Sequence, residues 1–384
     1  MTDKLTQSEL VALVKRVFAP GEDDKGLAII VDMPDAEVPD NNDWRVRRDM
    51  AAEWAELLAL KASELGLERI TLALYRNPRA NNADLPATAT IHEDGPLPET
   101  ADGFESSTVA FDHIFENYQI LIAPTEFSAT APLKMAAKKY HFRAATMPGF
   151  SPSMIPALRV DYEVVGARVD RLKSILDRAE GCAITFDARG VEHELFLDLR
   201  HRTAHASGGL FPVGGVAGNL PSGESYIVPY EGEVAGEATK SKGTLPVQFG
   251  ADIVVYEVEA NRAIEVLSSN PKSKEEAEKL AAEPAYGNLA ELGLGVLGDF
   301  GLEPTGEILL DEKLGLHIAF GRSEHFGGQV GPSDFSGPDK VVHIDRVYIP
   351  ALQADVKIRE ATVVFATGEK TLLMKDGEYR IDFA

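Results

Sequence analysis

Cysteine is almost absent from this sequence of 384 residues. Because Cys182 is the only one, the chain cannot form an internal disulfide, and a cluster of thiolate metal ligands is excluded. Long apolar runs are also missing, since no stretch approaches the roughly 20 apolar residues that a membrane-spanning helix needs. The N-terminal residues lack the basic and apolar regions of a secretory signal. We therefore expect a cytoplasmic protein that does not enter membranes.

Basic residues are scarce relative to acidic ones. The chain has 38 Lys and Arg residues against 61 Asp and Glu residues, which gives a formal net charge of -23. This balance disfavours nucleic acid and anionic membrane surfaces as partners, because both repel a negatively charged protein. Much of the charge lies in surface-type segments such as residues 21–24 and 274–278, so it promotes solubility and identifies no substrate.

The first half of the chain alternates helical and strand patterns, which predicts an α/β domain with a mostly parallel sheet. Residues 6–9 have the form of a capping box ahead of an amphipathic helix. The helices predicted here cover about 7–17, 45–64 and 128–138, and the buried strands cover 26–32, 70–75 and 118–123. A glycine-rich phosphate loop of the usual spacing is absent, so this domain need not bind a nucleotide.

Residues 77–103 of the first half are rich in Asn, Asp, Pro and Gly and predict an irregular surface loop.

The second half of the chain has a different pattern, with mostly short strand-like runs. An amphipathic helix predicted over 161–179 then connects the halves. Short β-type runs separated by glycine turns follow it, interrupted by one charged helix with a capping-box form at 273–276. Since the length suits about two domains, we predict an α/β domain over 1–178 and a strand-rich α+β domain over 179–384.

The second domain contains side chains of the kinds that bind metal ions. A β-branched run sends His343 and Asp345 to the same face of a strand. His317 lies in a short apolar run bounded by glycines, and Glu291 lies among apolar and glycine neighbours, where an unpaired charge would be costly. Glu224 follows a Pro-Ser-Gly turn at the start of a strand-like run. Singly, these residues could be an ion pair, a core histidine or an exposed carboxylate, but together they form a candidate metal site.

Eight short motifs give a more specific signal through their order along the chain. They cover residues 143–149, 161–162, 219–224, 290–295, 312–313, 317–321, 326–328 and 343–345. In this order, from about residue 110 to the C-terminus, the chain resembles the aminopeptidase T-like (thermophilic leucyl aminopeptidase) metallopeptidases. The resemblance implies an N-terminal α/β domain, a C-terminal two-metal site, and a homodimer that encloses the active sites. The metal ligands that it implies are Glu224, Glu291, His317, His343 and Asp345.

Two departures from the family pattern bear on the chemistry. In the characterised peptidases a tyrosine follows the first histidine, but the corresponding residues 322–326 contain none. Relatives have an asparagine after the second glutamate motif, where this chain has Val296 and Leu297. We take His325 as the catalytic group that replaces the tyrosine, and the alternative is that it is an ordinary loop histidine.

The leading hypothesis is a metal-dependent peptidase or amidohydrolase that acts on a small peptide or amide. Three carboxylates and two imidazoles suit two Zn²⁺, Co²⁺ or Mn²⁺ ions per chain, with a hydroxide between them. We expect Glu224 or Asp345 to bridge the two ions, and an acid near the cluster to protonate the leaving amine.

Two other hypotheses stay open. His317, His343 and Asp345 alone match the two-imidazole, one-carboxylate set of a mononuclear Fe(II) oxygenase. Ring-cleaving dioxygenases that act on dihydroxypyridines look like distant members of the same superfamily, so such a dioxygenase is the second hypothesis. The third is a non-catalytic homologue that binds a small molecule or serves as a structural scaffold.

The remaining histidines have weaker claims to a role. One of His201 and His205, on either side of Arg202, is a candidate hydrogen-bond donor behind the ligands. Structural or solvent-facing roles are expected for His92, His113, His141 and His193.

Overall fold

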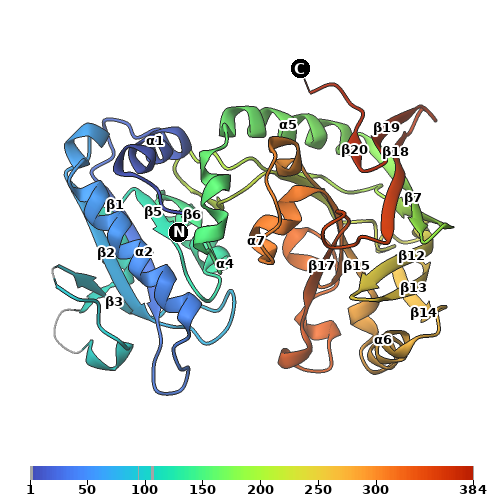
Figure 1. Cartoon of the computed structure of the whole chain (residues 1–384), viewed down its shortest axis with the longest axis horizontal. Coiled ribbons are helices and arrows are strands. Elements are labelled where there is room, and N and C mark those ends of the chain that lie inside the picture. The colour runs from blue at the N-terminus through green and yellow to red at the C-terminus, as the bar shows by residue number, and fades with distance from the viewer. Residues whose placement is uncertain (1–2, 94, 105–107, 384) are drawn as a thin grey trace. The chain divides into compact units, whose positions relative to one another are not determined.

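The computed structural model describes residues 3–93, 95–104 and 108–383 of the chain (Figure 1). The chain forms two compact units. The first comprises Met1–Gly166, Ser207–Ser222 and Thr305–Leu310, and the second comprises Ala167–Ala206, Gly223–Pro304 and Asp311–Ala384.

The α-helices and strands alternate along the first part of the chain, and strands predominate after α5. Up to residue 176 they are α1 (Gln7–Phe18), β1 (Gly26–Met33), α2 (Asn42–Ala59), β2 (Arg69–Arg76), β3 (Thr88–His92), β4 (Thr108–Ala110), α3 (Phe111–Asn117), β5 (Ile120–Ala123), α4 (Thr130–Tyr140), β6 (Arg143–Thr146) and α5 (Tyr162–Leu176). After it they are β7 (Ala179–Ala188), β8 (Val191–Asp198), β9 (His205–Ser207), β10 (Val216–Asn219), β11 (Glu224–Ile227), β12 (Lys242–Phe249), β13 (Asp252–Glu259), β14 (Arg262–Val266), α6 (Pro271–Ala282), β15 (Leu289–Gly295), α7 (Ile308–Asp311), β16 (Leu316–Gly321), β17 (His343–Val347), β18 (Val356–Phe365), β19 (Lys370–Lys375) and β20 (Glu378–Tyr379).

The first unit contains a seven-stranded sheet in the order β10-β6-β5-β1-β2-β3-β4. The neighbouring strands β10, β6, β5, β1 and β2 all pair in parallel. At the other edge of the sheet, β3 pairs antiparallel with both β2 and β4. Every residue of β1 is buried, as expected for a central parallel strand that is covered on both faces. The predicted α/β class with a mostly parallel sheet is confirmed.

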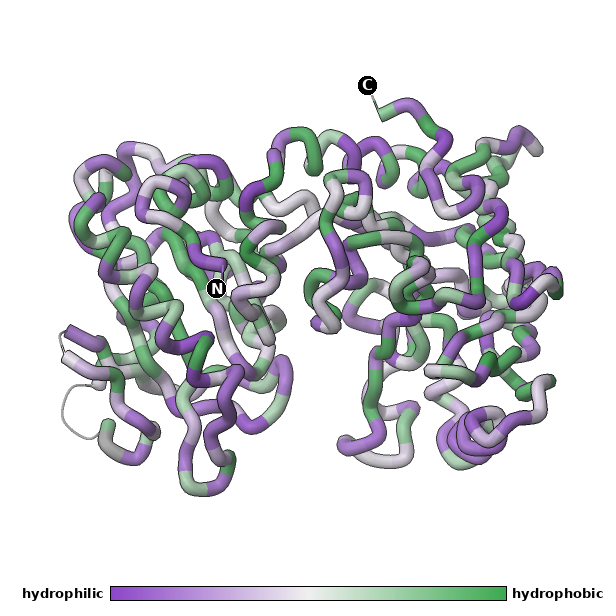
Figure 2. Tube along the Cα trace, viewed as in Figure 1, coloured by the Kyte–Doolittle hydropathy of each residue, from purple (hydrophilic) through white to green (hydrophobic). Residues whose placement is uncertain are grey.

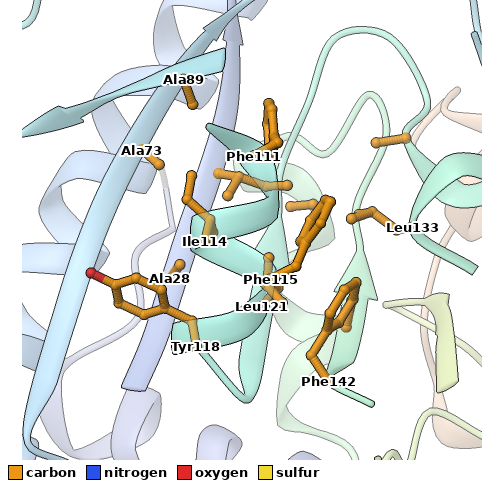
Figure 3. Close-up of a cluster of buried hydrophobic side chains, with 14 of the residues drawn as sticks. Ala28, Ala73, Ala89, Phe111, Ile114, Phe115, Tyr118, Leu121, Leu133 and Phe142 are labelled. Carbon is orange, nitrogen blue, oxygen red and sulfur yellow. The ribbon is translucent and has the colours of Figure 1, made fainter. Parts of the chain in front are cut away.

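One face of this sheet is covered by α3 and α4 through an aromatic cluster. Phe115 of α3 stacks on Phe142, which precedes β6, with 5.0 Å between the ring centroids. Tyr75 of β2 meets Phe111 edge to face at 5.3 Å. Figure 3 shows the rings of Phe111, Phe115 and Phe142 together with the small strand residues Ala28 and Ala73.

The helix α1 shows how local sequence sets an element boundary. The Thr6 hydroxyl accepts the backbone N–H of Glu9, and the Glu9 carboxylate accepts the backbone N–H of Thr6, so the predicted capping box is confirmed. The helix packs beside α2, which in turn lies against β1 and β2 (Figure 1). Within the described ranges, no helix has the length and apolarity needed to cross a bilayer.

The second unit is rich in antiparallel strands, as predicted. An eight-stranded sheet has the order β14-β13-β12-β8-β7-β18-β19-β20, and a five-stranded sheet has the order β17-β16-β15-β11-β9. The charged helix α6 packs against β13 and β14 and is almost entirely hydrophilic in Figure 2. The prediction that residues 274–278 face solvent holds for most of this run but is wrong for Glu276, which is buried and accepts hydrogen bonds from the hydroxyls of Tyr256 and Tyr286.

Two further local predictions are wrong. Residues 77–103 are not irregular throughout, because β3 pairs with β2 inside this range. The helix α6 does not begin with a capping box at residues 273–276. Its N-cap is Asn270, whose side chain accepts the backbone N–H of Ser273, and Pro271 occupies the first turn. Proline is favoured there because the first-turn N–H groups need no helical partner.

Candidate metal centre

Four neighbouring strands of the five-stranded sheet carry the residues expected as ligands. Glu224 opens β11, Glu291 lies on β15, His317 lies on β16, and His343 and Asp345 lie on β17. The sheet therefore brings together segments that are far apart in the sequence.

The antiparallel register places these side chains on one face. Residues opposite one another on adjacent strands share a face, and alternate residues of one strand point to the same side. Ala319 lies opposite both Glu291 and Asp345, so these two carboxylates belong to one row across the sheet. In the neighbouring row Gly293 lies opposite His317.

The donor atoms form two groups that share one carboxylate. The Nε2 atom of His317 lies 3.3 Å from Oε1 of Glu291 and 3.6 Å from Oε2 of Glu224. The Nε2 atom of His343 lies 3.3 Å from Oε2 of Glu291 and 3.5 Å from Oδ1 of Asp345. The donors thus form two sets of three, and the atoms of each set lie close enough together to bind one ion. The first set is Glu224, Glu291 and His317, and the second is Glu291, His343 and Asp345.

These separations suit ligands of a metal ion. With bond lengths of about 2.1 Å, adjacent ligand atoms of one ion lie roughly 3.0–3.4 Å apart. In addition, the Oε2 atom of Glu224 is buried and accepts no hydrogen bond from the described residues. A buried carboxylate oxygen without a donor is costly, and a cation would satisfy it.

Both imidazoles are oriented from behind by backbone carbonyls. The Nδ1 atom of His343 donates to the carbonyl oxygen of Arg322 at 2.8 Å, and that of His317 faces the carbonyl oxygen of Gly315 at 3.4 Å. Because a carbonyl can only accept, Nδ1 holds the proton and Nε2 points toward the carboxylates. This is the usual support of a metal-binding histidine.

The electrostatics of the cluster are those of a site with excess negative charge. Burial disfavours the charged form of His317, but the hydrogen bond to Glu291 and the charges of Glu224 and Asp345 outweigh it and raise its pKa to about 9. Burial likewise opposes ionisation of Glu291, but hydrogen bonds from His317 and His343 lower its pKa to about 2. The imidazoles thus take up protons to balance the carboxylates, and a divalent ion would compete for the same atoms.

Lys313 and Glu312 complete the charged cluster, although the sequence predicts a role for neither. The ammonium of Lys313 is fully buried and donates to Oε1 of Glu224 at 2.7 Å and to Oε1 of Glu312. Burial lowers the pKa of Lys313, but the charges of Glu224 and Glu312 outweigh it and raise the pKa above its usual value. Lys313 therefore holds one oxygen of Glu224 and leaves the other free for an ion. Burial also raises the pKa of Glu312, to about 8.

Two glycines of β15 give this face the space that the cluster needs. A Cβ atom at Gly293 would lie 1.9 Å from Nε2 of His317, so the imidazole rests directly on the glycine. A Cβ atom at Gly295, which lies opposite Glu224, would lie 2.3 Å from the carbonyl carbon of Lys313. Glycine inside a strand commonly marks such a close approach.

An aromatic group borders the ligand set. His325 packs on Phe326 with 3.9 Å between ring centroids, and it lies 5.3 Å from His343. Burial, followed by the charges of His343 and Arg322, lowers the pKa of His325 to about 4, so its imidazole is neutral at neutral pH. His205 hydrogen-bonds through Nε2 to the carbonyl oxygen of Phe326 at 2.9 Å.

The other histidines lie in different surroundings. His201 pairs with Glu237 at 2.9 Å on an exposed edge. His92 contacts the carbonyl oxygen of Gly95, His113 contacts Asn117, His141 ends α4 in a left-handed conformation, and His193 contacts Thr244.

Comparisons with known proteins show the fold alone. No protein-family model matches the chain, and no curated protein matches its sequence. The solved structure of 2,5-dihydroxypyridine dioxygenase from Pseudomonas putida KT2440 is similar, with a TM-score of 0.61 and 13% identity over 98% of each chain. Wild-type AmpT (aminopeptidase T) from Thermus thermophilus is similar with a TM-score of 0.54 and 16% identity, over 98% of this chain and 99% of that one. The likeness to AmpT supports a distant structural relationship between the two chains.

Proposed function

We propose that this chain is a metal-dependent hydrolase of peptide or amide bonds that holds two divalent ions on the face formed by β11, β15, β16 and β17. The observation that carries the proposal is the position of Glu291, whose two carboxylate oxygens each face a different imidazole. Both imidazoles direct Nε2 at it from fixed backbone supports. A carboxylate between two such donor sets is the natural bridge of a two-ion site.

The donor set also suggests which ions would bind. Glu224, Glu291 and His317 would hold one ion, and Glu291, His343 and Asp345 the other. Three carboxylates with two imidazoles suit Zn²⁺, Co²⁺ or Mn²⁺. The sequence favours Glu224 or Asp345 as the bridge, whereas the arrangement of the oxygens leads us to propose Glu291.

A two-ion site supplies Lewis acidity and a water of lowered pKa. In the hydrolysis the water oxygen bonds to the carbonyl carbon, the C–N bond breaks, and one proton of the water passes to the leaving amine. We propose His325 as the carrier of that proton, because its neutral imidazole lies beside His343 and is partly exposed. Glu312 is the competing carrier, since its half-buried carboxyl lies next to the ion pair of Glu224 and Lys313.

The proposed substrate is a small peptide or amide, and the proposed assembly is a homodimer. Both come from the resemblance to the aminopeptidase T-like peptidases, and AmpT supports them only as a structural neighbour. Hydrolysis of a panel of aminoacyl p-nitroanilides tests the substrate class, and light scattering tests the assembly.

A second function has one specific observation in its favour. Lys313 places a fixed positive charge on Glu224, so the ion position next to it is partly compensated already. A single Fe(II) would then make a ring-cleaving dioxygenase; the sequence favours His317, His343 and Asp345 as its ligands, which come from both donor sets. The probe that the similar structure suggests is 2,5-dihydroxypyridine.

Metal counting with activity assays separates the two functions. The hydrolase predicts about two Zn²⁺, Co²⁺ or Mn²⁺ ions per chain, and Glu291→Gln should lose both the second ion and hydrolysis. Glu283→Gln is a matched control, because Glu283 is a buried carboxylate of the same unit that accepts from Ser336 and lies outside the donor sets. One Fe per chain with O₂-dependent loss of 2,5-dihydroxypyridine would instead establish the dioxygenase.

A further inference from the structure

Tyr226 lies on the same face of the sheet as the donor residues. It follows Glu224 by two positions on β11, so alternation turns both side chains to the same side. Across the sheet Tyr226 lies opposite Gly293, and Gly293 lies opposite His317. Because glycine has no side chain, nothing from the intervening strand separates the tyrosine from the ligand row.

Aromatic neighbours hold the ring of Tyr226 in place. It stacks on His205 with 5.0 Å between centroids and 20° between planes, and it meets Phe326 edge to face at 4.8 Å. Phe326 in turn meets His343 edge to face at 5.5 Å. Such contacts restrict a ring to one orientation, so the phenol is positioned before any ligand arrives.

The hydroxyl of Tyr226 is the feature that this packing leaves unexplained. Within residues 3–93, 95–104 and 108–383 it has no hydrogen-bond partner. By contrast, the imidazoles of His205 and His343, which belong to the same aromatic cluster, each hydrogen-bond to a backbone carbonyl. The remaining donors on this face are engaged, since Lys313 donates to Glu224 and Glu312, and the imidazole Nε2 atoms face carboxylates. The Tyr226 side chain is only half-buried and its hydroxyl is open to solvent, so a bound substrate can reach this unused donor.

We propose that the Tyr226 hydroxyl donates a hydrogen bond to the carbonyl oxygen of the scissile bond when substrate occupies the metal centre. The inference rests on the proposed hydrolase function and names a residue for it. Negative charge grows on that oxygen as water adds, and the carboxylates of the site cannot donate to it. A preorganised neutral donor stabilises that charge more than it stabilises the ground state. Tyr226 is then a catalytic residue, and His205 and Phe326 are the positioning residues that hold its ring.

The test compares Tyr226→Phe with Tyr118→Phe. Phenylalanine keeps the ring and its stacking and removes only the hydroxyl. Tyr118 of the first unit is a matched control. Its hydroxyl donates to Thr71, and neither residue belongs to the five-stranded sheet that carries the donor sets. In the metal-loaded full chain, kcat on aminoacyl p-nitroanilides should fall about 100- to 1,000-fold in Tyr226→Phe, the range for removing one such donor. KM should stay within threefold and the ion count should be unchanged.

A second measurement uses an inhibitor that resembles the tetrahedral intermediate, so that the role of the hydroxyl is tested independently of turnover. Leucine phosphonate should bind the Co²⁺-loaded Tyr226→Phe variant at least tenfold more weakly than the wild type, by calorimetry. Values of kcat and phosphonate affinity within threefold of the wild type would overturn the proposal, and so would loss of bound metal in Tyr226→Phe, which would make the residue a structural support. If the wild type hydrolyses none of the anilides, the proposed function fails, and the phosphonate affinities alone decide the role of Tyr226.

Discussion

Replacing Gly293 with alanine is expected to expel the His317 imidazole from the donor face. The added Cβ atom would lie 1.9 Å from Nε2, 2.1 Å from Cε1 and 2.6 Å from Cδ2 of that ring. Folded proteins essentially never show Cβ contacts below 3.0 Å, so the ring must retreat by at least about 1 Å. The retreat is directed away from Gly293, and it must displace Nε2, which is both the atom in closest conflict and the atom that faces Glu291.

The size of the effect follows from the geometry. A metal bond of about 2.1 Å does not tolerate a ligand displaced by 1 Å. Disturbing the support of a metal-bound histidine commonly costs 10- to 100-fold in affinity, and we expect at least that loss for the ion held by Glu224, Glu291 and His317. Overpacking should also lower the free energy of unfolding of the metal-free chain by about 1–3 kcal/mol.

Two controls make this prediction specific. Gly166→Ala adds a methyl group whose nearest foreign heavy atom lies 3.8 Å away, so it should change neither ion binding nor stability by overpacking. In a His317→Ala background the ring is gone, and Gly293→Ala should then cost less than about 0.5 kcal/mol, because two residues in contact couple strongly in a double-mutant cycle.

Titration with Zn²⁺ by calorimetry and chemical unfolding of the metal-free proteins provide the readouts. Wild-type ion affinity and stability in Gly293→Ala would refute the argument, since the imidazole could not then rest on the glycine. An equal cost of Gly293→Ala in the His317→Ala background would refute it as well, because the penalty would have another source.

Three further predictions concern charge and metal. Lys313→Met should destabilise the metal-free chain by about 3–5 kcal/mol, because it leaves buried carboxylates without their ammonium; Lys61→Met, at an exposed pair, should stay within about 0.5 kcal/mol of the wild type by the same unfolding assay. Chelation of divalent ions should lower the Tm, since ligand at 100 times its Kd stabilises by about 2.7 kcal/mol; an unchanged Tm in calorimetry would favour a non-catalytic homologue. Burial raises the pKa of Asp32 to about 6, above its unfolded value near 4, so the folded chain binds more protons in this window and loses stability as pH rises. From pH 4 to pH 7 urea unfolding should show the wild type losing about 2 kcal/mol relative to Asp32→Asn, and parallel pH profiles would contradict this.

Features that depend on neighbouring residues could be predicted from the sequence. The capping box of Thr6 and Glu9 and the buried strand β1 are of this kind, and both are confirmed. The common face of His343 and Asp345 also follows from alternation within one strand, and their side chains do approach one another. Each of these needs only the geometry of a single helix or strand.

The assembly of the site depends on strand order, which no local pattern encodes. Nothing near Glu291 indicates that β16 separates its strand from that of Asp345. The burial of Lys313 is hidden for the same reason, because a Glu-Lys pair normally lies on the surface. Tyr226 could have been found, since it alternates with Glu224 on a strand-like run.

The two errors in secondary structure have physical causes too. The strand β3 alternates polar and apolar residues over 88–92, but the polar turn residues around it dominate the composition of the segment. At α6 two start signals compete, and Asn270 followed by Pro271 prevails over the later Ser273.

Anomalous diffraction from crystals soaked in Zn²⁺ would show directly whether the chain binds two ions on this face. The account predicts two peaks about 3.5–4 Å apart, one beside each carboxylate oxygen of Glu291, with His317 near the first and His343 near the second. A structure with no peak on this face, or with the carboxylate of Glu291 paired only to protonated imidazoles at saturating Zn²⁺, would contradict it.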